Sequence, residues 1–210
     1  MDCIFSNKKK NIYAICFSLF YIVMLTLKID FRVSLFQNLR YTINSLFVYL
    51  TPMIFPIFIL VLIFTSKKDY KFKTWLLPIV LGVELIVSIL TQISNVFNMK
   101  VTVPLYGLKY LPIFLFSFLM FVAIALMFLG TLFNLKYINL LKYGALGYAI
   151  LYLCSGIIDF IYVGGFAYIQ SVPAEYSAIN IVALVRLISC ALFYVGVFIL
   201  TTNKRNTNLV

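Results

Sequence analysis

Six long apolar runs dominate this sequence, and they limit the folds that the chain can adopt. The runs cover residues 11–27, 43–65, 74–94, 111–133, 138–168 and 179–201. A helix needs about 20 mostly apolar residues to cross a bilayer, whereas a membrane β-strand needs about 10 that alternate in polarity. The runs have the length and uniform composition of helices. They predict an all-α integral membrane protein, a bundle of six transmembrane helices forming a single polytopic membrane domain over residues 1–210.

The composition excludes a soluble domain. Apolar residues make up 64% of the chain and charged residues only 11%, whereas soluble domains are about half apolar and a quarter charged. A chain with so few polar residues cannot cover a water-facing surface. The excess of Lys, Asn, Ile, Phe and Tyr over Arg, Ala and Gly is typical of an AT-rich genome. This bias favours a bacterial source. Together with the apolar composition, it leads us to expect a multi-pass protein of the cell membrane, which in a bacterium is the cytoplasmic membrane.

The distribution of positive charge predicts the orientation of the bundle. With the N-terminus inside, the inner segments hold eleven of the 17 Lys and Arg residues, the outer segments hold five, and Arg186 lies within the last run. Basic residues are enriched in cytoplasmic loops, and an even number of spans returns the chain to its starting side. Both termini are therefore predicted to be cytoplasmic. The net charge of +11 is then a topology signal with some attraction to anionic lipid, and it requires no nucleic acid partner.

Two connections on the predicted outer side are long enough to have structure of their own. Residues 28–41 and 95–110 alternate partially between apolar and polar side chains. This pattern is compatible with short strands and with interfacial segments that cap the outer face, and both alternatives stay open.

The residue types present argue against an enzyme and against a metal or cofactor site. The chain has no histidine, which removes the commonest general base and metal ligand. Its four cysteines include no Cys-x-x-Cys pair, so a zinc site is not expected. We predict no catalytic residue, no metal and no cofactor. An intramembrane enzyme that uses Glu84 and Asp159 as paired acids ranks last among the functional hypotheses.

Three ionisable residues lie well inside the runs: Glu84, Asp159 and Arg186. A charge at the bilayer centre costs about 2.5–3.5 kcal/mol on insertion scales, so such residues usually face the bundle interior. They lie seven to ten residues from the outer ends of their runs, which places them within about 5 Å of one another along the membrane normal. Asp159 and Arg186 belong to consecutive runs, and we predict that they form an ion pair. Such a pair can also be purely structural, setting the register of the helices.

Polar residues at helical spacing extend this cluster. Glu84, Ser88 and Thr91 recur at i, i+4 and i+7 along the third run, and Asn95 continues them. Tyr148, Tyr152, Ser155, Asp159 and Tyr162 form a similar stripe on the fifth run. We predict a cavity between the third, fifth and sixth runs that opens to the outer face. Its predicted ligand-binding residues are Glu84, Ser88, Thr91, Tyr152, Asp159, Tyr162 and Arg186.

These features favour a permease, or a membrane subunit that captures a substrate from the outer side. The predicted site holds two acidic residues and one basic residue, and this balance favours a small cationic or zwitterionic solute. Six spans with both termini inside is also the layout of ABC-type permease subunits and vitamin-capturing subunits, a match of topology alone. Besides the lipid bilayer, that layout admits another membrane subunit or a cytoplasmic motor as partner. The alternative is a non-transporting scaffold, immunity or assembly subunit whose intramembrane charges are structural.

Overall fold

The computed structural model describes residues 8–26, 39–64, 70–106, 111–132, 138–162 and 174–202, and these residues form six helices and no strand. The all-α prediction is therefore confirmed for the described part of the chain. The helices are α2 (Lys8–Thr26), α3 (Leu39–Phe64), α4 (Tyr70–Tyr106), α5 (Leu111–Thr131), α6 (Ile138–Tyr162) and α8 (Ala174–Thr201). Each of them overlaps one of the six apolar runs.

The length of α4 corrects one prediction. Residues 95–106 continue this helix instead of forming strands or a capping segment. No glycine or proline interrupts the sequence between Gly82 and Pro104, so the intrahelical hydrogen bonds of the apolar run propagate past its end. At about 1.5 Å per residue α4 is about 55 Å long and exceeds the hydrocarbon thickness of about 30 Å. Residues 28–38, 107–110 and 163–168 of the predicted segments lie outside the described residues.

Helix length and surface composition identify a membrane-embedded protein. Five helices, α2, α4, α5, α6 and α8, contain an apolar window long enough to cross a membrane, and the apolar stretch of α3 over its described side chains is Pro52–Phe64. The outer faces of the helices carry large apolar side chains that would contact water in a soluble protein. Examples are Leu19, Phe20, Ile57, Phe64, Ile86, Leu90, Leu115 and Phe118. Lipid is the solvent that matches this surface.

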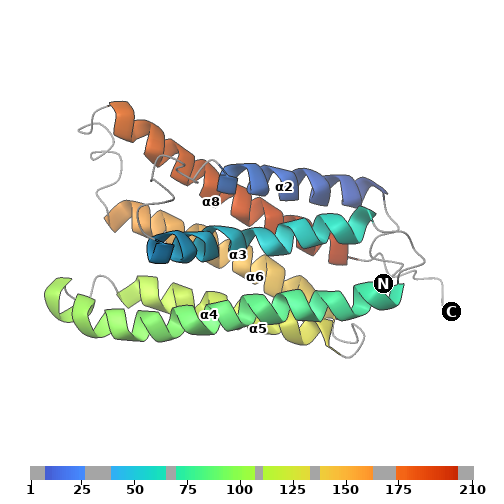
Figure 1. The fold of residues 1–210 in the computed structure, drawn as a ribbon, viewed down its shortest axis with the longest axis horizontal. Helices are drawn as coiled ribbons and strands as arrows, with labels where there is room; N and C mark the ends of the chain where they lie inside the picture. Colours follow the sequence, from blue (N-terminus) through green and yellow to red (C-terminus); the bar gives the residue numbers. More distant parts are fainter. Residues whose placement is uncertain are drawn as a thin grey trace.

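The six helices follow one another around a ring. Each packs against its neighbours in the sequence, and α2 packs against α8, which closes the circle. The least extensive of these contacts is the one between α3 and α4. In Figure 1, α2 and α8 lie along one side of the bundle, α4 and α5 along the opposite side, and α3 and α6 between them.

An aromatic core fills the part of the ring between α2, α3, α6 and α8. The ring of Phe193 lies 5.6 Å from that of Tyr21 and 5.3 Å from that of Phe55. Tyr194, next along α8, lies 4.2 Å from the ring of Tyr148 on α6. Such aromatic pairs contribute about 0.5–1.5 kcal/mol each beyond their area burial. This side of the bundle is tightly packed.

Contacts at the helix ends show that the chain begins and finishes its helical part at one end of the bundle. The Lys10 Nζ atom donates a hydrogen bond to the Thr202 carbonyl, which links the start of α2 to the end of α8. At the same end, Lys142 Nζ lies 5.3 Å from the ring centroid of Phe198. The assignment of this end to the cytoplasm remains a prediction.

Candidate functional site

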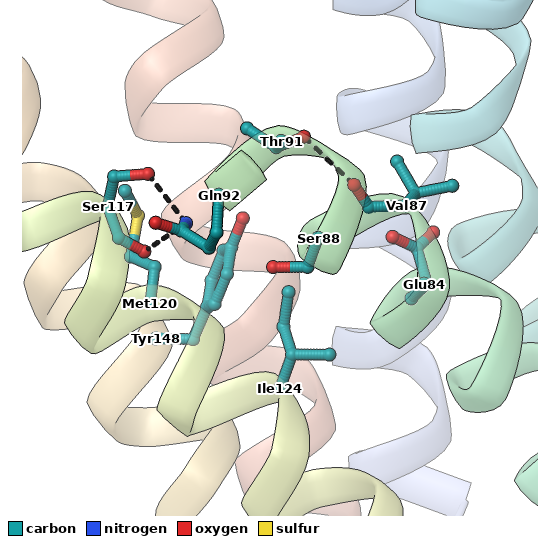
Figure 2. A pocket seen from close by; sticks show the side chains of 9 residues that line it. All are labelled: Glu84, Val87, Ser88, Thr91, Gln92, Ser117, Met120, Ile124 and Tyr148. Atoms are coloured by element: carbon teal, nitrogen blue, oxygen red, sulfur yellow. Dashed lines mark hydrogen bonds between the residues drawn. The ribbon is translucent and has the colours of Figure 1, made fainter. Parts of the chain in front are cut away.

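A pocket of about 170 Å³ opens between α4, α5 and α6 (Figure 2). Five of its lining residues come from α4, three from α5 and one from α6. They are Glu84, Val87, Ser88, Thr91, Gln92, Ser117, Met120, Ile124 and Tyr148. The α4 residues run from Glu84, in the middle of the apolar window Leu76–Ile93, to Gln92 at its C-terminal end. In Figure 1 that end of α4 lies opposite the end of α8 where Lys10 and Thr202 meet.

Helix α4 supplies the polar wall of this pocket. Glu84, Ser88 and Thr91 share a face because residues separated by four and seven positions lie on one side of a helix. The Thr91 hydroxyl donates to the Val87 carbonyl at 2.9 Å, so its hydrogen is already used inside α4. The half-buried Glu84 is the acidic residue among the described lining.

A hydrogen-bonded bridge joins α4 to α5 at the other end of the pocket. The Gln92 amide nitrogen donates to the Ser117 carbonyl at 3.0 Å and to the Ser117 hydroxyl oxygen at 2.9 Å. The amide nitrogen is therefore directed at α5, and the amide carbonyl oxygen is left to accept. Figure 2 shows this bridge on one side of the pocket and Glu84 on the other, with Ser88 and Tyr148 between them.

The chemistry of the lining is rich in hydrogen-bond acceptors. Its lining residues carry carboxyl, hydroxyl and amide groups, and no Lys or Arg is among the described lining residues. Val87, Met120 and Ile124 add apolar surface between the polar groups. Such a lining suits a positively charged group, because the carboxylate of Glu84 supplies opposite charge and the neutral oxygens replace water.

The structure places the predicted site residues in two groups. Glu84, Ser88 and Thr91 line the pocket together. Tyr152 and Arg186 lie close to each other and to Cys190, away from the pocket lining. Neither residue is among the described lining of the pocket.

Two further predicted residues, Asp159 and Tyr162, fall within the backbone range of α6, but their side chains lie outside the described part of the structure. The predicted ion pair between Asp159 and Arg186 falls outside it as well and stays a prediction.

The predicted cavity and this pocket differ in one wall. From the sequence, a cavity is expected between the third, fifth and sixth runs, which are α4, α6 and α8, and that cavity stays a prediction. The pocket that contains Glu84 has its third wall from α5. The ring order explains the difference, because α5 lies between α4 and α6 whereas α8 lies one helix further round.

Sequence reasoning missed several members of this pocket. Gln92 is a polar residue in an apolar run, and its position eight residues after Glu84 was a usable signal. Tyr148 was recognised in the tyrosine stripe without being chosen as a site residue. Ser117, Met120 and Ile124 carry no such signal, because single Ser and Met residues are common in packed membrane helices.

Metal ligation receives no support in the described residues. Over these ranges no group of three or more His, Cys, Asp and Glu side chains is arranged to hold a metal ion. Comparisons of the chain with protein-family models, curated proteins and solved structures found no match. A functional argument therefore has to rest on the geometry of the pocket.

Proposed function

We propose that this membrane protein captures a small cationic or zwitterionic solute in the Glu84 pocket, as a permease or as the substrate-binding subunit of one. The single observation that carries the proposal is a half-buried carboxylate at the edge of a cavity of about 170 Å³ lined by neutral oxygens. A carboxylate within a membrane needs a proton, a cation or a polar ligand to offset its burial. A cavity beside it gives such a ligand room.

The position of the pocket supports capture from the outer side. Its α4 residues run from the middle of the apolar window Leu76–Ile93 to the end of that window farther from the contact between Lys10 and Thr202. If that contact is cytoplasmic, as the distribution of basic residues predicts, then the pocket extends from the middle of the membrane into its outer half. A cytoplasmic motor or a second membrane subunit is part of this proposal as an expected partner.

The proposal is tested with full-length protein purified in detergent and a panel of alkylammonium chlorides and amino acids. Binding of one of these probes at a hundredfold excess over its Kd should raise the Tm by about 5–10 °C. Glu84→Gln keeps the size of the side chain and removes its charge. We expect this variant to fold and to lose the Tm increase.

Arg186→Gln is the matched control, because it also removes an intramembrane charge but lies outside the described lining of the pocket. It should keep the response to the probe even if its own Tm falls. The absence of any probe-induced shift in the wild-type protein would contradict capture, and so would an equal shift in Glu84→Gln.

The alternative function is a scaffold, immunity or assembly subunit. The wide apolar surface favours it, because exposed apolar side chains pack against other membrane proteins as well as against lipid. In that case Glu84→Gln should leave every ligand response at zero and change only the Tm.

A further inference from the structure

We infer that the solute is a primary ammonium compound with an uncharged chain of about six non-hydrogen atoms in total, lying between Glu84 and the Gln92–Ser117 bridge. This inference rests on the proposed function and narrows it to one of its two ligand classes. It excludes a zwitterion and a bare alkali ion. The charge of the pocket lining, the hydrogen-bond donors in that lining and the volume of the pocket each support the inference.

Charge within the pocket is confined to one end. Glu84 carries the negative charge, while Gln92 and Ser117 at the other end are neutral and bonded to each other. Figure 2 shows these groups on opposite sides of the opening. An ammonium group has three hydrogens to donate, and the carboxylate and the Ser88 hydroxyl oxygen are the acceptors at that end.

The donors available in the pocket disfavour a carboxylate on the ligand. The Gln92 amide nitrogen is already directed at the Ser117 carbonyl and hydroxyl oxygens. The remaining donors of the described lining, the hydroxyls of Ser88, Ser117 and Tyr148, are uncharged. The Thr91 hydroxyl donates to its own helix. Among the described lining residues there is no cationic side chain. The carboxylate of a zwitterion would therefore lose its water without gaining a charged partner, and it would also be repelled by Glu84.

The size of the pocket sets the length of ligand that it can cover. A buried cavity of about 150 Å³ holds one benzene molecule, which has six non-hydrogen atoms. The volume here is about 170 Å³, so a five-carbon primary amine fits, while a bare sodium ion would leave most of the space to water. Val87, Met120 and Ile124 supply the apolar surface for the carbon chain. Each methylene that they bury should strengthen binding about fourfold.

The test measures binding to the full-length protein by isothermal titration calorimetry. The probes are the primary alkylammonium chlorides from methylammonium to heptylammonium, the zwitterion 5-aminopentanoate, and sodium chloride. We expect affinity to rise to a maximum near pentylammonium, which should bind about tenfold or more tightly than methylammonium or 5-aminopentanoate. Glu84→Gln should weaken pentylammonium binding about tenfold or more, because a charge-assisted hydrogen bond is lost.

A second variant tests the length argument without touching the charge. Met120→Ala enlarges the apolar part of the pocket, and we expect the affinity maximum to move to a chain about two methylenes longer. Since Met120 is only partly buried, this variant is expected to fold. An unchanged maximum in Met120→Ala would overturn the assignment of the chain to this part of the pocket.

Two kinds of failure are distinguishable in this experiment. If 5-aminopentanoate, methylammonium or sodium binds as tightly as pentylammonium and loses its affinity in Glu84→Gln, the ammonium-chain inference is wrong but the capture function stands. If no probe binds in a way that depends on Glu84, both the inference and the proposed function are overturned. If affinity rises steadily with chain length and is equal in wild type and Glu84→Gln, the probes are partitioning into detergent. This result counts as the second failure.

Discussion

At the residue scale, the bridge between Gln92 and Ser117 decides the shape of one end of the pocket. It contains two contacts of different kinds, because the Gln92 amide donates both to a backbone carbonyl and to a side-chain hydroxyl. Removal of the hydroxyl leaves the backbone contact in place, whereas removal of the amide breaks both. Substitution of Gln92 should therefore lower the free energy of unfolding more than substitution of Ser117.

We predict that Gln92→Leu lowers the free energy of unfolding by about 0.6–2 kcal/mol, since interhelical hydrogen bonds in membranes contribute about that much. Ser117→Ala should cost less than half as much, because Gln92 can still donate to the Ser117 carbonyl. Thermal unfolding of the purified variants measures both values. A larger loss in Ser117→Ala than in Gln92→Leu would show that the bridge is not as described.

The residue scale also shows how far spacing alone can predict a site. Glu84, Ser88 and Thr91 are found on one wall because an α-helix fixes which residues share a face. The opposite wall depends on which helix packs there. Ser117 is one hydroxyl in an apolar run, and nothing in its sequence neighbourhood states that α5 faces Glu84. Whether these residues bind a solute is a separate question that the ligand experiments address.

At the element scale, α5 and α6 approach closely where glycine removes the side chain. A Cβ atom on Gly144 would lie 2.9 Å from the Ala123 carbonyl oxygen and 2.8 Å from Met127 Cγ. Gly147 lies less than one turn further along α6. Apart from the backbone of its own helix, no atom would lie within 4 Å of a Cβ atom added there. Since both residues occupy one helix, they form a matched pair for the packing of α6 against α5.

We predict opposite effects of the same substitution at these two positions. Gly144→Ala should destabilise the protein by about 1–3 kcal/mol, because either α5 or α6 must move to admit the methyl group. Gly147→Ala should be neutral, or should stabilise the protein by up to about 1 kcal/mol through its higher helix propensity. Thermal unfolding under identical detergent conditions gives the comparison. Equal losses at both positions would contradict the helix packing described here.

Element boundaries were predictable where composition changes and were missed where it does not. The six runs appear as helices because an unpaired backbone N–H or C=O group is costly in a bilayer, and a helix pairs these groups within one segment. The extension of α4 over residues 95–106 was not recognised, because polar residues such as Asn95 and Asn98 enter the sequence there. Falling hydropathy marks the end of a membrane span, but it does not mark the end of a helix.

At the scale of the whole molecule, the ring is closed by the contact between its first and last helices. A Cβ atom on Gly196 of α8 would lie 3.4 Å from the Ala14 Cα atom of α2. The Lys10–Thr202 hydrogen bond joins the same two helices at their ends. Because each helix packs beside its sequence neighbours, the Glu84 pocket lies between the consecutive helices α4, α5 and α6, and α8 lies on the far side of α6.

We predict that Ala14→Cys combined with Gly196→Cys forms an intramolecular disulfide under mild oxidation. The experiment uses a background in which the four native cysteines are replaced. Adjacent backbones of this kind fall within the Cα–Cα range of about 4.4–6.8 Å that a disulfide spans. The control pair, Ala14→Cys with Ala123→Cys on α5, should not cross-link. Gel mobility with and without reductant reports the result, and cross-linking of the control pair alone would contradict the ring order.

The central claim is that Glu84 meets a ligand inside the membrane, and its protection from chemical modification tests this most directly. The protein in lipid vesicles is treated with a hydrophobic carbodiimide, and peptide mass spectrometry follows the total modification of each carboxyl group, which is the sum of its N-acylurea and its pentylamide. We predict that Glu84 is modified, and that pentylammonium at about ten times its Kd slows this modification about tenfold. Glu175, the second residue of α8, is the control, and its modification should be unchanged. An unreactive Glu84, or a Glu84 modified at the same rate with and without pentylammonium, would contradict the account.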